Sequence, residues 1–248
     1  MADSKEAAQV MSITIYPLKS CRGISVPEAA LSSTGFRWDR QWIVVNSKGR
    51  ACTQRVEPSL ALIEVELPNE AFSEGWEPNP SSFLVSQSRP TDPNYAPGYK
   101  IKFNDAYPFL LISQKSLDVL NEQLKEPVSI NRFRPNILID GSNPFCEDLW
   151  KDVKIGENTF HSTELCYRCK VPTINQETAE AGSEPSETLM KFRSDKVLKT
   201  NKKPQGRIYF GQMLVWEDYV AQEKRKTIKV GDPVYVLKMV SSYDDVSV

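Results

Sequence analysis

Residues 153–165 read VKIGENTFHSTEL, and this stretch indicates what kind of fold the chain forms. Residues 153–155 and 159–165 carry β-branched and aromatic side chains of the kind that strands favour. Gly156-Glu157-Asn158 stands between them and is a typical turn sequence. The stretch therefore predicts a β-hairpin whose second strand leads directly into the next loop.

That loop, residues 165–173, reads LCYRCKVPT and holds two of the chain's five cysteines. A thiolate is a soft metal ligand, and the planar guanidinium of Arg168 is suited to phosphate. One hypothesis is that a thiol of this loop holds a metal and that Arg168 binds the anionic cofactor carrying it. The spacing of Cys166 and Cys169 also fits two other interpretations, namely buried small side chains at a strand end or a redox dithiol.

Strand and turn patterns continue on both sides of the hairpin. Leucines at helical spacing after Ser113 predict a helix over residues 113–124, and residues 184–193 predict a second one. Residues 226–237 predict another hairpin, and Gly211 indicates a bulge or the close approach of a ligand within its strand. Many short strands with few helices predict a mostly β fold of the α+β class, closed as a barrel. The other strands are predicted at residues 12–18, 41–45, 60–67, 108–112, 137–139 and 208–216.

Basic side chains stand at the ends of several predicted strands. Lys19 and Ser20 belong to a turn that either points N–H groups and an ammonium at a phosphate or is simply solvated. Arg134 precedes a buried strand, where charges occur only if they are paired or used. Arg40 lies in residues 37–42, among two tryptophans and other charged side chains. This segment fits either a set of surface ion pairs or the wall of a site for a flat, charged ligand.

The overall composition is that of an ordinary soluble globular protein, with 40% hydrophobic and 25% charged residues among 248. The net charge of −1 argues against nucleic-acid binding by bulk electrostatics, so a bound anion must be held by a local basic cluster. Five irregularly spaced cysteines argue against a disulfide framework. The single histidine, His161, argues against most zinc sites and against hydrolase triads.

No apolar run is long enough to span a bilayer, and the polar start of the chain is unlike a targeting segment. We therefore expect an intracellular protein, cytosolic or mitochondrial, with no membrane association encoded in this chain. Residues 69–97 are rich in Pro, Ser, Asn and Glu, which predicts a long loop or a boundary. Together with the resemblance described next, this predicts two modules, residues 1–97 and residues 98–248.

Several separate motifs resemble one known family. Residues 16–23 (YPLKSCRG) and 37–42 (RWDRQW) resemble the N-terminal β-barrel module that precedes MOSC domains. Residues 131–136 (NRFRPN), 166–169 (CYRC) and 208–212 (IYFGQ) resemble the MOSC domain itself. The motifs occur in the right order over nearly the whole chain, and the combination is similar to the mitochondrial amidoxime-reducing components, in a plant-like form. The resemblance implies a MOSC-type β-barrel with an N-terminal MOSC module.

The resemblance further implies a molybdenum-cofactor oxidoreductase that reduces amidoximes, hydroxylamines and N-oxides. In that family the electrons come from NADH through cytochrome b5 reductase and cytochrome b5. By its position, Cys169 matches the molybdenum ligand and is the implied catalytic residue. The positions that match the family's contacts to the Mo-molybdopterin cofactor are Lys19, Ser20, Arg40, Arg134, Asn136, Arg168 and Cys169.

A cofactor carrier is the alternative, because the C-terminal MOSC part of molybdenum cofactor sulfurases carries similar motifs. This chain lacks the desulfurase region with its Schiff-base lysine, so no pyridoxal phosphate is expected. The chain also departs from the family between Val85 and Arg89, where family members usually carry several tens of additional residues. The physiological substrate and the oligomeric state do not follow from the sequence.

Overall fold

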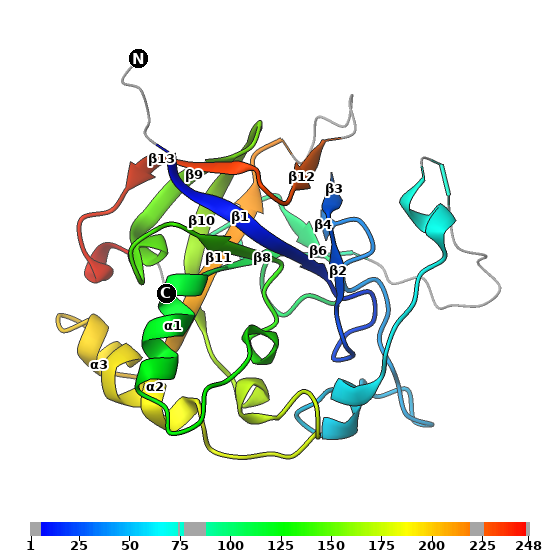
Figure 1. Cartoon of the computed structure of the whole chain (residues 1–248), viewed down its shortest axis with the longest axis horizontal. Coiled ribbons are helices and arrows are strands. Elements are labelled where there is room, and N and C mark those ends of the chain that lie inside the picture. The colour runs from blue at the N-terminus through cyan, green and yellow to red at the C-terminus, as the bar shows by residue number, and fades with distance from the viewer. Residues whose placement is uncertain (1–5, 74, 77–87, 219–225, 247–248) are drawn as a thin grey trace.

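The hairpin predicted from residues 153–165 is present and forms part of the wall of a β-barrel (Figure 1). The computed structural model describes residues 6–73, 75–76, 88–218 and 226–246. Strand β9 (Trp150–Ile155) pairs antiparallel with β10 (Asn158–Tyr167). Gly156 turns the chain at φ 56°, and a Cβ atom there would lie 2.8 Å from Oδ2 of Asp232. This turn therefore needs glycine.

The barrel is a closed ring of seven strands within the described residues. They are β1 (Glu6–Ile15), β7 (Phe109–Ser113), β8 (Ile137–Asp140), β9, β10, β11 (Tyr209–Trp216) and β13 (Pro233–Met239). Their order is β13–β9–β10–β11–β7–β8–β1, and β1 pairs back onto β13. Only the β7–β8 pairing of this ring is parallel, and both strands are almost entirely buried, as their apolar runs require.

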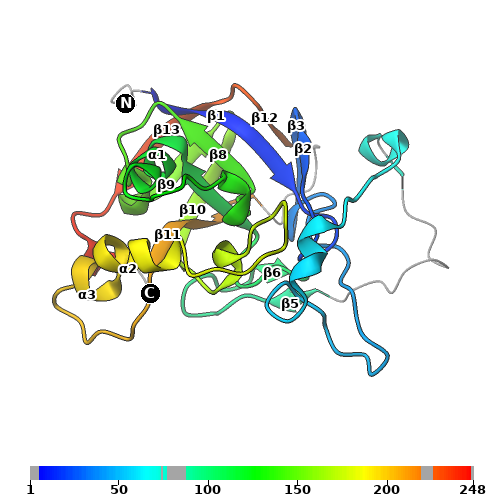
Figure 2. The same ribbon diagram turned by 60° about the horizontal axis from the view of Figure 1, so that its bottom comes forward.

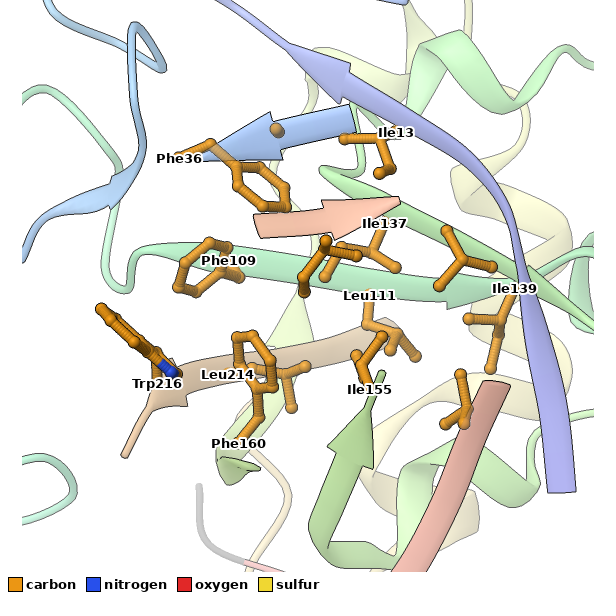
Figure 3. Packing of buried hydrophobic residues seen from close by; sticks show 14 of the residues in the cluster. Ile13, Phe36, Phe109, Leu111, Ile137, Ile139, Ile155, Phe160, Leu214 and Trp216 are labelled. Carbon is orange, nitrogen blue, oxygen red and sulfur yellow. The ribbon is translucent and has the colours of Figure 1, made fainter. Parts of the chain in front are cut away.

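The barrel interior is a packed core. Figure 3 shows its apolar side chains, in which Phe109 packs edge-on against Phe160 with ring centroids 5.4 Å apart. Leu111 and Ile137 point into the same cluster and are 1% and 0% exposed. Burying a side chain of this size contributes roughly 1.5–3 kcal/mol. Because the interior is filled, a ligand site has to lie outside it.

The described α-helices gather on one outer side of the barrel, away from β2 and β3 (Figures 1 and 2). The helix α1 (Gln114–Glu122) confirms the first predicted helix, and α2 (Ser186–Arg193) confirms the second. The short α3 (Asp195–Leu198) follows directly. Side chains of α1 and α2 pack into a second apolar cluster that also contains Phe133 and Cys166.

Shorter strands surround the barrel. They are β2 (Ile24–Val26), β3 (Glu28–Ser32), β4 (Gly35–Phe36), β5 (Arg89–Pro90), β6 (Lys100–Ile101) and β12 (Thr227–Lys229). The strand β1 pairs with β8 and β13, and β3 pairs with β12, so strand pairing joins residues 1–97 to residues 98–248. The mostly β barrel with few helices confirms the predicted fold class, while the exact division into two modules stays a prediction.

Two predicted strands are wrong. Residues 41–45 form only isolated bridges, between Leu18 and Trp42 and between Val45 and Ala51. Residues 60–67 begin as a 3-10 helix, Pro58–Leu62, and continue without regular structure. Proline near the start of that helix presets its backbone angle, and among the described residues no strand pairs with residues 63–67.

The hairpin predicted over residues 226–237 is also wrong, although both of its strands exist. The strand β12 pairs with β3, and β13 pairs with β9 and β1, so the Gly-Asp-Pro turn joins two different sheets. The bulge predicted at Gly211 is present, because the pairing of β10 with β11 shifts register between Leu165–Gln212 and Tyr167–Tyr209. The close approach at Gly211 is to β7. A Cβ atom on this residue, whose φ is 90°, would lie 2.7 Å from Cγ1 of Ile112.

Candidate functional site

A cavity of ≈ 280 Å³ lies where the end of β10 meets loops from both halves of the chain. Its wall combines residues 19–20, 53–55 and 104–107 with residues 133, 134 and 136 and with the cysteine loop, residues 165–173, of which 166–169 and 171 line the cavity. All the residues predicted for the site line this cavity, namely Lys19, Ser20, Arg40, Arg134, Asn136, Arg168 and Cys169. The fold thus brings together seven positions that are spread over 150 residues of sequence.

Three of these residues have strained backbone. The φ angles of Ser20, Arg40 and Arg134 are 71°, 48° and 56°. A left-handed conformation costs a non-glycine residue about 1–2 kcal/mol, and it persists only where the surrounding structure holds it. Such strain is typical of ligand sites, because it directs side chains in ways that regular structure does not.

The guanidinium groups of two of the arginines lie over the aromatic ring of Tyr16. The guanidinium carbons of Arg134 and Arg40 are 4.2 and 4.7 Å from the centroid of its ring, within the range of cation–π attraction. Burial raises the pKa of Tyr16 to about 12, and its hydroxyl donates to the carbonyl oxygen of Pro135 (3.2 Å). The neutral ring therefore holds two cations close together without neutralising either one.

Asp39, which is 1% exposed, compensates the charge of Arg40. Its Oδ2 accepts hydrogen bonds from Nη1 of Arg40 (2.6 Å) and Nδ2 of Asn104 (3.1 Å), and its Oδ1 accepts from the backbone N–H of Tyr16 (2.9 Å). Asn136 adds a further acceptor, because its Oδ1 lies 3.1 Å from Nη1 of Arg40. Asp39 and Asn136 thus fix the position of Arg40 at the cavity.

Arg134 and Arg168 have no carboxylate partner among the described residues. The Nη2 of Arg134 is buried and, within the described chain, has no hydrogen-bond partner, and burial lowers the pKa of this group to about 10. Arg168 donates to the carbonyl oxygen of Phe133 (2.8 Å) and to Sγ of Cys166 (2.9 Å), but its buried Nε likewise lacks a partner there. Leaving a buried charged donor unpaired is costly, so these two atoms indicate an anionic ligand.

The two cysteines of the loop have different surroundings. Cys166 is 6% exposed, its Sγ accepts the hydrogen bond from Arg168, and burial raises the pKa of its thiol. Cys169 is half-buried in the cavity wall, and within the described residues its thiol has no hydrogen-bond partner. Cys169 is therefore the thiol available to a ligand, whereas Cys166 is engaged by the protein.

Lys19 stands at the rim of the cavity. Its Nζ donates to Oδ1 of Asp105 and to the carbonyl oxygen of Phe103, both at 2.6 Å, and Arg55 lies 3.6 Å from the same carboxylate oxygen. Desolvation raises the pKa of Asp105, but the attraction of Lys19, reinforced by Arg40 and Arg55, outweighs it and holds this pKa below its ordinary value. The rim is thus ion-paired, unlike Arg134 and Arg168 in the inner wall, which have no carboxylate partner among the described residues.

The sequence indicated Asp39 only as a possible surface ion-pair partner of Arg37 and Arg40, and the structure shows it buried and paired with Arg40. Tyr16, Asn104 and Asp105 were not predicted for the site, although Tyr16 lies within the first N-terminal motif beside Lys19 and Ser20. No local signal marks Asn104 or Asp105, because their roles depend on contacts with residues 65 to 86 positions earlier.

The arrangement combines an available thiol with unpaired cations. Among the described residues, no group of three or more His, Cys, Asp or Glu side chains is placed to hold a metal ion. A metal bound through Cys169 would therefore have to bring its other ligands with it, as part of an anionic cofactor.

None of the helices in the described ranges is long and apolar enough to cross a membrane.

Comparison with known proteins finds relatives of two kinds and one similar solved structure. Mitochondrial amidoxime-reducing component 1 of Mus musculus is 30% identical over 290 aligned positions, which cover 94% of this chain and 83% of that protein. Molybdenum cofactor sulfurase of Arabidopsis thaliana is 30% identical over 90% of this chain but only 34% of its own length. The solved structure of the YUAD protein from Bacillus subtilis is similar with a TM-score of 0.45 and 10% identity, covering 92% of this chain and 93% of that one.

Because 290 aligned positions exceed the 248 residues of this chain, the mouse protein has residues in the aligned span that this chain lacks. The short segment expected between Val85 and Arg89 lies largely outside the described residues. The MOSC N-terminal beta barrel domain matches residues 7–86, and the MOSC domain matches residues 98–235. With both matches in order over most of its length, this chain belongs to the MOSC domain family.

Proposed function

We propose that this protein is a molybdenum-cofactor oxidoreductase that reduces N-hydroxylated compounds such as amidoximes, hydroxylamines and N-oxides. One observation carries the proposal: two buried guanidinium donors without partners among the described residues belong to the same cavity wall as an available thiol. The similarity to proteins named amidoxime-reducing components, at 30% identity over 94% of the chain, supports the substrate class.

The residues of the cavity suit this cofactor chemically. The molybdenum cofactor is an anionic pterin with a phosphate group, and when bound it supplies a redox centre for two-electron chemistry. Cys169 would hold its metal, because a thiolate is a soft ligand. Arg134 and Arg168 would donate their free N–H groups to its anionic groups, with Ser20 and the ammonium of Lys19 beside them. Asn136 would act indirectly, by holding Arg40.

The electrons would come from a protein donor. Each turnover needs two electrons, and the sequence contains no dinucleotide-binding fingerprint. We propose cytochrome b5 as the direct donor and NADH-cytochrome b5 reductase as its source of electrons. Docking of the donor near the cavity would be helped by complementary charge, so the rate would fall as salt screens the approach.

The test is reduction of benzamidoxime by purified, molybdenum-loaded protein in the presence of NADH, the reductase and cytochrome b5. We expect NADH oxidation only when the N-hydroxylated compound is added. Cys169→Ser is expected to abolish it, because a serine oxygen is a harder ligand than a thiolate and would not reproduce the electronic environment of the metal. Cys166→Ala is the matched control and should lose stability at most. Normal turnover by Cys169→Ser with full molybdenum content would contradict the assignment.

A cofactor carrier or sulfurase-type module is the second candidate. It is favoured by the 30% identity to the plant molybdenum cofactor sulfurase, in an alignment that covers 90% of this chain. A carrier would bind the cofactor equally well, so molybdenum content alone does not separate the two. The discriminating result is turnover. Fully loaded protein that reduces no amidoxime, hydroxylamine or N-oxide would favour the carrier.

A further inference from the structure

Of the described residues that line the cavity, two carry carboxyl groups, and the surroundings of these two groups are opposite. Asp105 is at the rim, its side chain is 62% exposed, and it forms ion pairs with Lys19 and Arg55. Glu164 is only 8% exposed, and its carboxyl group makes no hydrogen bond or ion pair with another described residue. A buried carboxyl group without a partner favours its neutral, protonated form.

The position of Glu164 relates it to the cysteine loop. It lies on β10, and Cys166 lies two residues further along the same strand. Side chains two residues apart on a strand point to the same face, and both of these line the cavity. Leu165, between them, points the other way and packs with Tyr209 and Val246. Glu164 thus forms part of the wall of the same cavity as Cys169, on the strand that leads into its loop.

Several groups around Glu164 influence its ionisation. Burial is the largest influence and raises the pKa of Glu164, the attraction of Arg207 opposes this, Asp92 reinforces it, and Lys199 opposes it weakly. The ammonium of Lys199 is directed elsewhere, because its Nζ donates to the carbonyl oxygen of Val246 (2.9 Å). Tyr107, which also lines the cavity, faces Glu164 as well.

We propose that Glu164 is the proton donor of this cavity, an inference that rests on the reductase function proposed above. Reduction of an amidoxime, R–C(NH2)=N–OH, breaks the N–O bond and yields R–C(NH2)=NH and water, at the expense of two electrons and two protons. The electrons come from the donor protein by way of the cofactor. The carboxyl O–H of Glu164 gives one proton to the departing oxygen, solvent water gives the second, and solvent reprotonates the carboxylate before the next turnover.

The other titratable groups of the wall fit this role less well. Asp105 is held as a carboxylate by Lys19 and Arg55. Burial raises the pKa of Tyr107 far above the neutral range, which makes its hydroxyl a weak acid. The thiol of Cys166 is engaged by Arg168. Among the lining acids of the described residues, Glu164 is the one that is buried and lacks a competing partner, and burial raises its pKa and so favours the protonated form.

The first test is Glu164→Gln, which keeps the shape of the side chain and removes its acidic proton. We expect an unchanged molybdenum content and a kcat for benzamidoxime that is lower by about 10²–10⁴-fold, the usual contribution of a general acid. The kcat of the wild-type protein should fall as the pH rises through the pKa of Glu164, and the variant should lack this limb. Thermal unfolding of both proteins checks that the fold is retained.

The second test does not depend on turnover. Infrared difference spectra of the cofactor-free protein, recorded against pH, should contain the C=O stretch of a protonated carboxyl group that is missing in Glu164→Gln. Asp92→Asn, which retains the side-chain acceptor that bonds the N–H of Asn94, should lower the pH at which this band disappears. Arg207→Gln should raise it, because Arg207 is the main attraction opposing protonation.

The outcomes separate the two proposals. Loaded wild-type protein without turnover would overturn the reductase function, and the role of Glu164 with it. Normal turnover with an unchanged pH profile in Glu164→Gln would overturn only the role of Glu164. Disappearance of this band in the pH range of an ordinary exposed glutamate would also overturn that role alone. If Glu164→Gln fails to fold, the opposite shifts of the band in Asp92→Asn and Arg207→Gln assign it to Glu164 instead.

Discussion

Arg193 and Arg134 are two buried arginines with opposite environments. Arg193 is 2% exposed and all of its nitrogens are used: Nε donates to the carbonyl oxygen of Tyr209 (3.2 Å), Nη1 to the hydroxyl of Tyr243 (3.2 Å) and Nη2 to the carboxylate of Asp148. Burial acts to lower the pKa of Arg193, but Asp148 and Tyr243 outweigh it and raise the pKa above its ordinary value. Arg134 lies on a neutral ring and keeps an unpaired Nη2 among the described residues.

This difference indicates whether each arginine stabilises the fold or binds a ligand. A buried cation whose donors are all satisfied by the chain links elements of the fold, and Arg193 joins α2 to β11 and to the C-terminal segment. A buried cation with a free donor leaves part of its desolvation uncompensated. Such a group is kept where a ligand completes its contacts, which makes the cavity a binding site and the Arg193 cluster an architectural one.

The largest effect is expected from breaking the architectural pair. Arg193→Met should lower the free energy of unfolding by about 3–5 kcal/mol, because it leaves the carboxylate of Asp148 buried without a cation. Urea unfolding followed by circular dichroism measures this. Arg193→Met combined with Asp148→Leu should recover most of the loss, since no charge is then left uncompensated. A loss below about 1 kcal/mol for Arg193→Met would contradict the architectural role.

A smaller effect should come from the titration of Glu147, next to Asp148. Burial, followed by the charge of Asp148, raises the pKa of Glu147 from 4.5 to about 7. Because the folded-state pKa is the higher one, the stabilisation is complete below about pH 4.5 and is lost as the pH rises to about 7, by at most on the order of 3 kcal/mol. Urea unfolding across this range should give a falling stability in the wild type and a flatter profile in Glu147→Gln.

Replacing Arg134, the unpaired cation, should weaken cofactor binding and leave the stability of the fold nearly unchanged, whereas replacing Arg193 should lower that stability. Arg134→Met should leave the stability of the cofactor-free protein nearly unchanged, since the charge it removes is not paired. Its affinity for the anionic cofactor should fall by about 10–100-fold, as expected for a charge-assisted hydrogen bond of roughly 1.5–3 kcal/mol. Molybdenum per chain after dialysis, with urea unfolding in parallel, measures both. Full molybdenum retention together with a large loss of stability would place Arg134 in the architectural class.

The smallest effect is expected at the rim. Asp105→Asn should change the free energy of unfolding by about 0–1 kcal/mol, because the ion pair with Lys19 is solvated at the carboxylate side and screened by salt. It should also free Lys19, so cofactor retention should rise slightly. Unfolding and molybdenum content at low and high salt test this, and a loss of stability comparable to that of Arg193→Met would show that the rim is architectural too.

Local patterns were sufficient for elements whose partners are close in sequence. The β9–β10 hairpin, α1, α2 and β8 occur where the sequence predicts them, because turn chemistry and periodicity act over a few residues. The pairing of β12 was not predictable in this way. Its partner β3 lies about 200 residues earlier, and the adjacent turn at Gly231 would serve a hairpin equally well.

The same division applies to the site. The sequence alone determined which basic residues and which cysteine pair stand at strand ends, and its motifs connected them to one family. It did not determine which of these charges stay unpaired, because Arg134 and Arg193 look alike until their neighbours are known. Nor did it distinguish Glu164 from Asp105, since a carboxyl group becomes a proton donor or an ion-pair partner according to burial and charge. Those are properties of the assembled structure, and only the tertiary fold decides them.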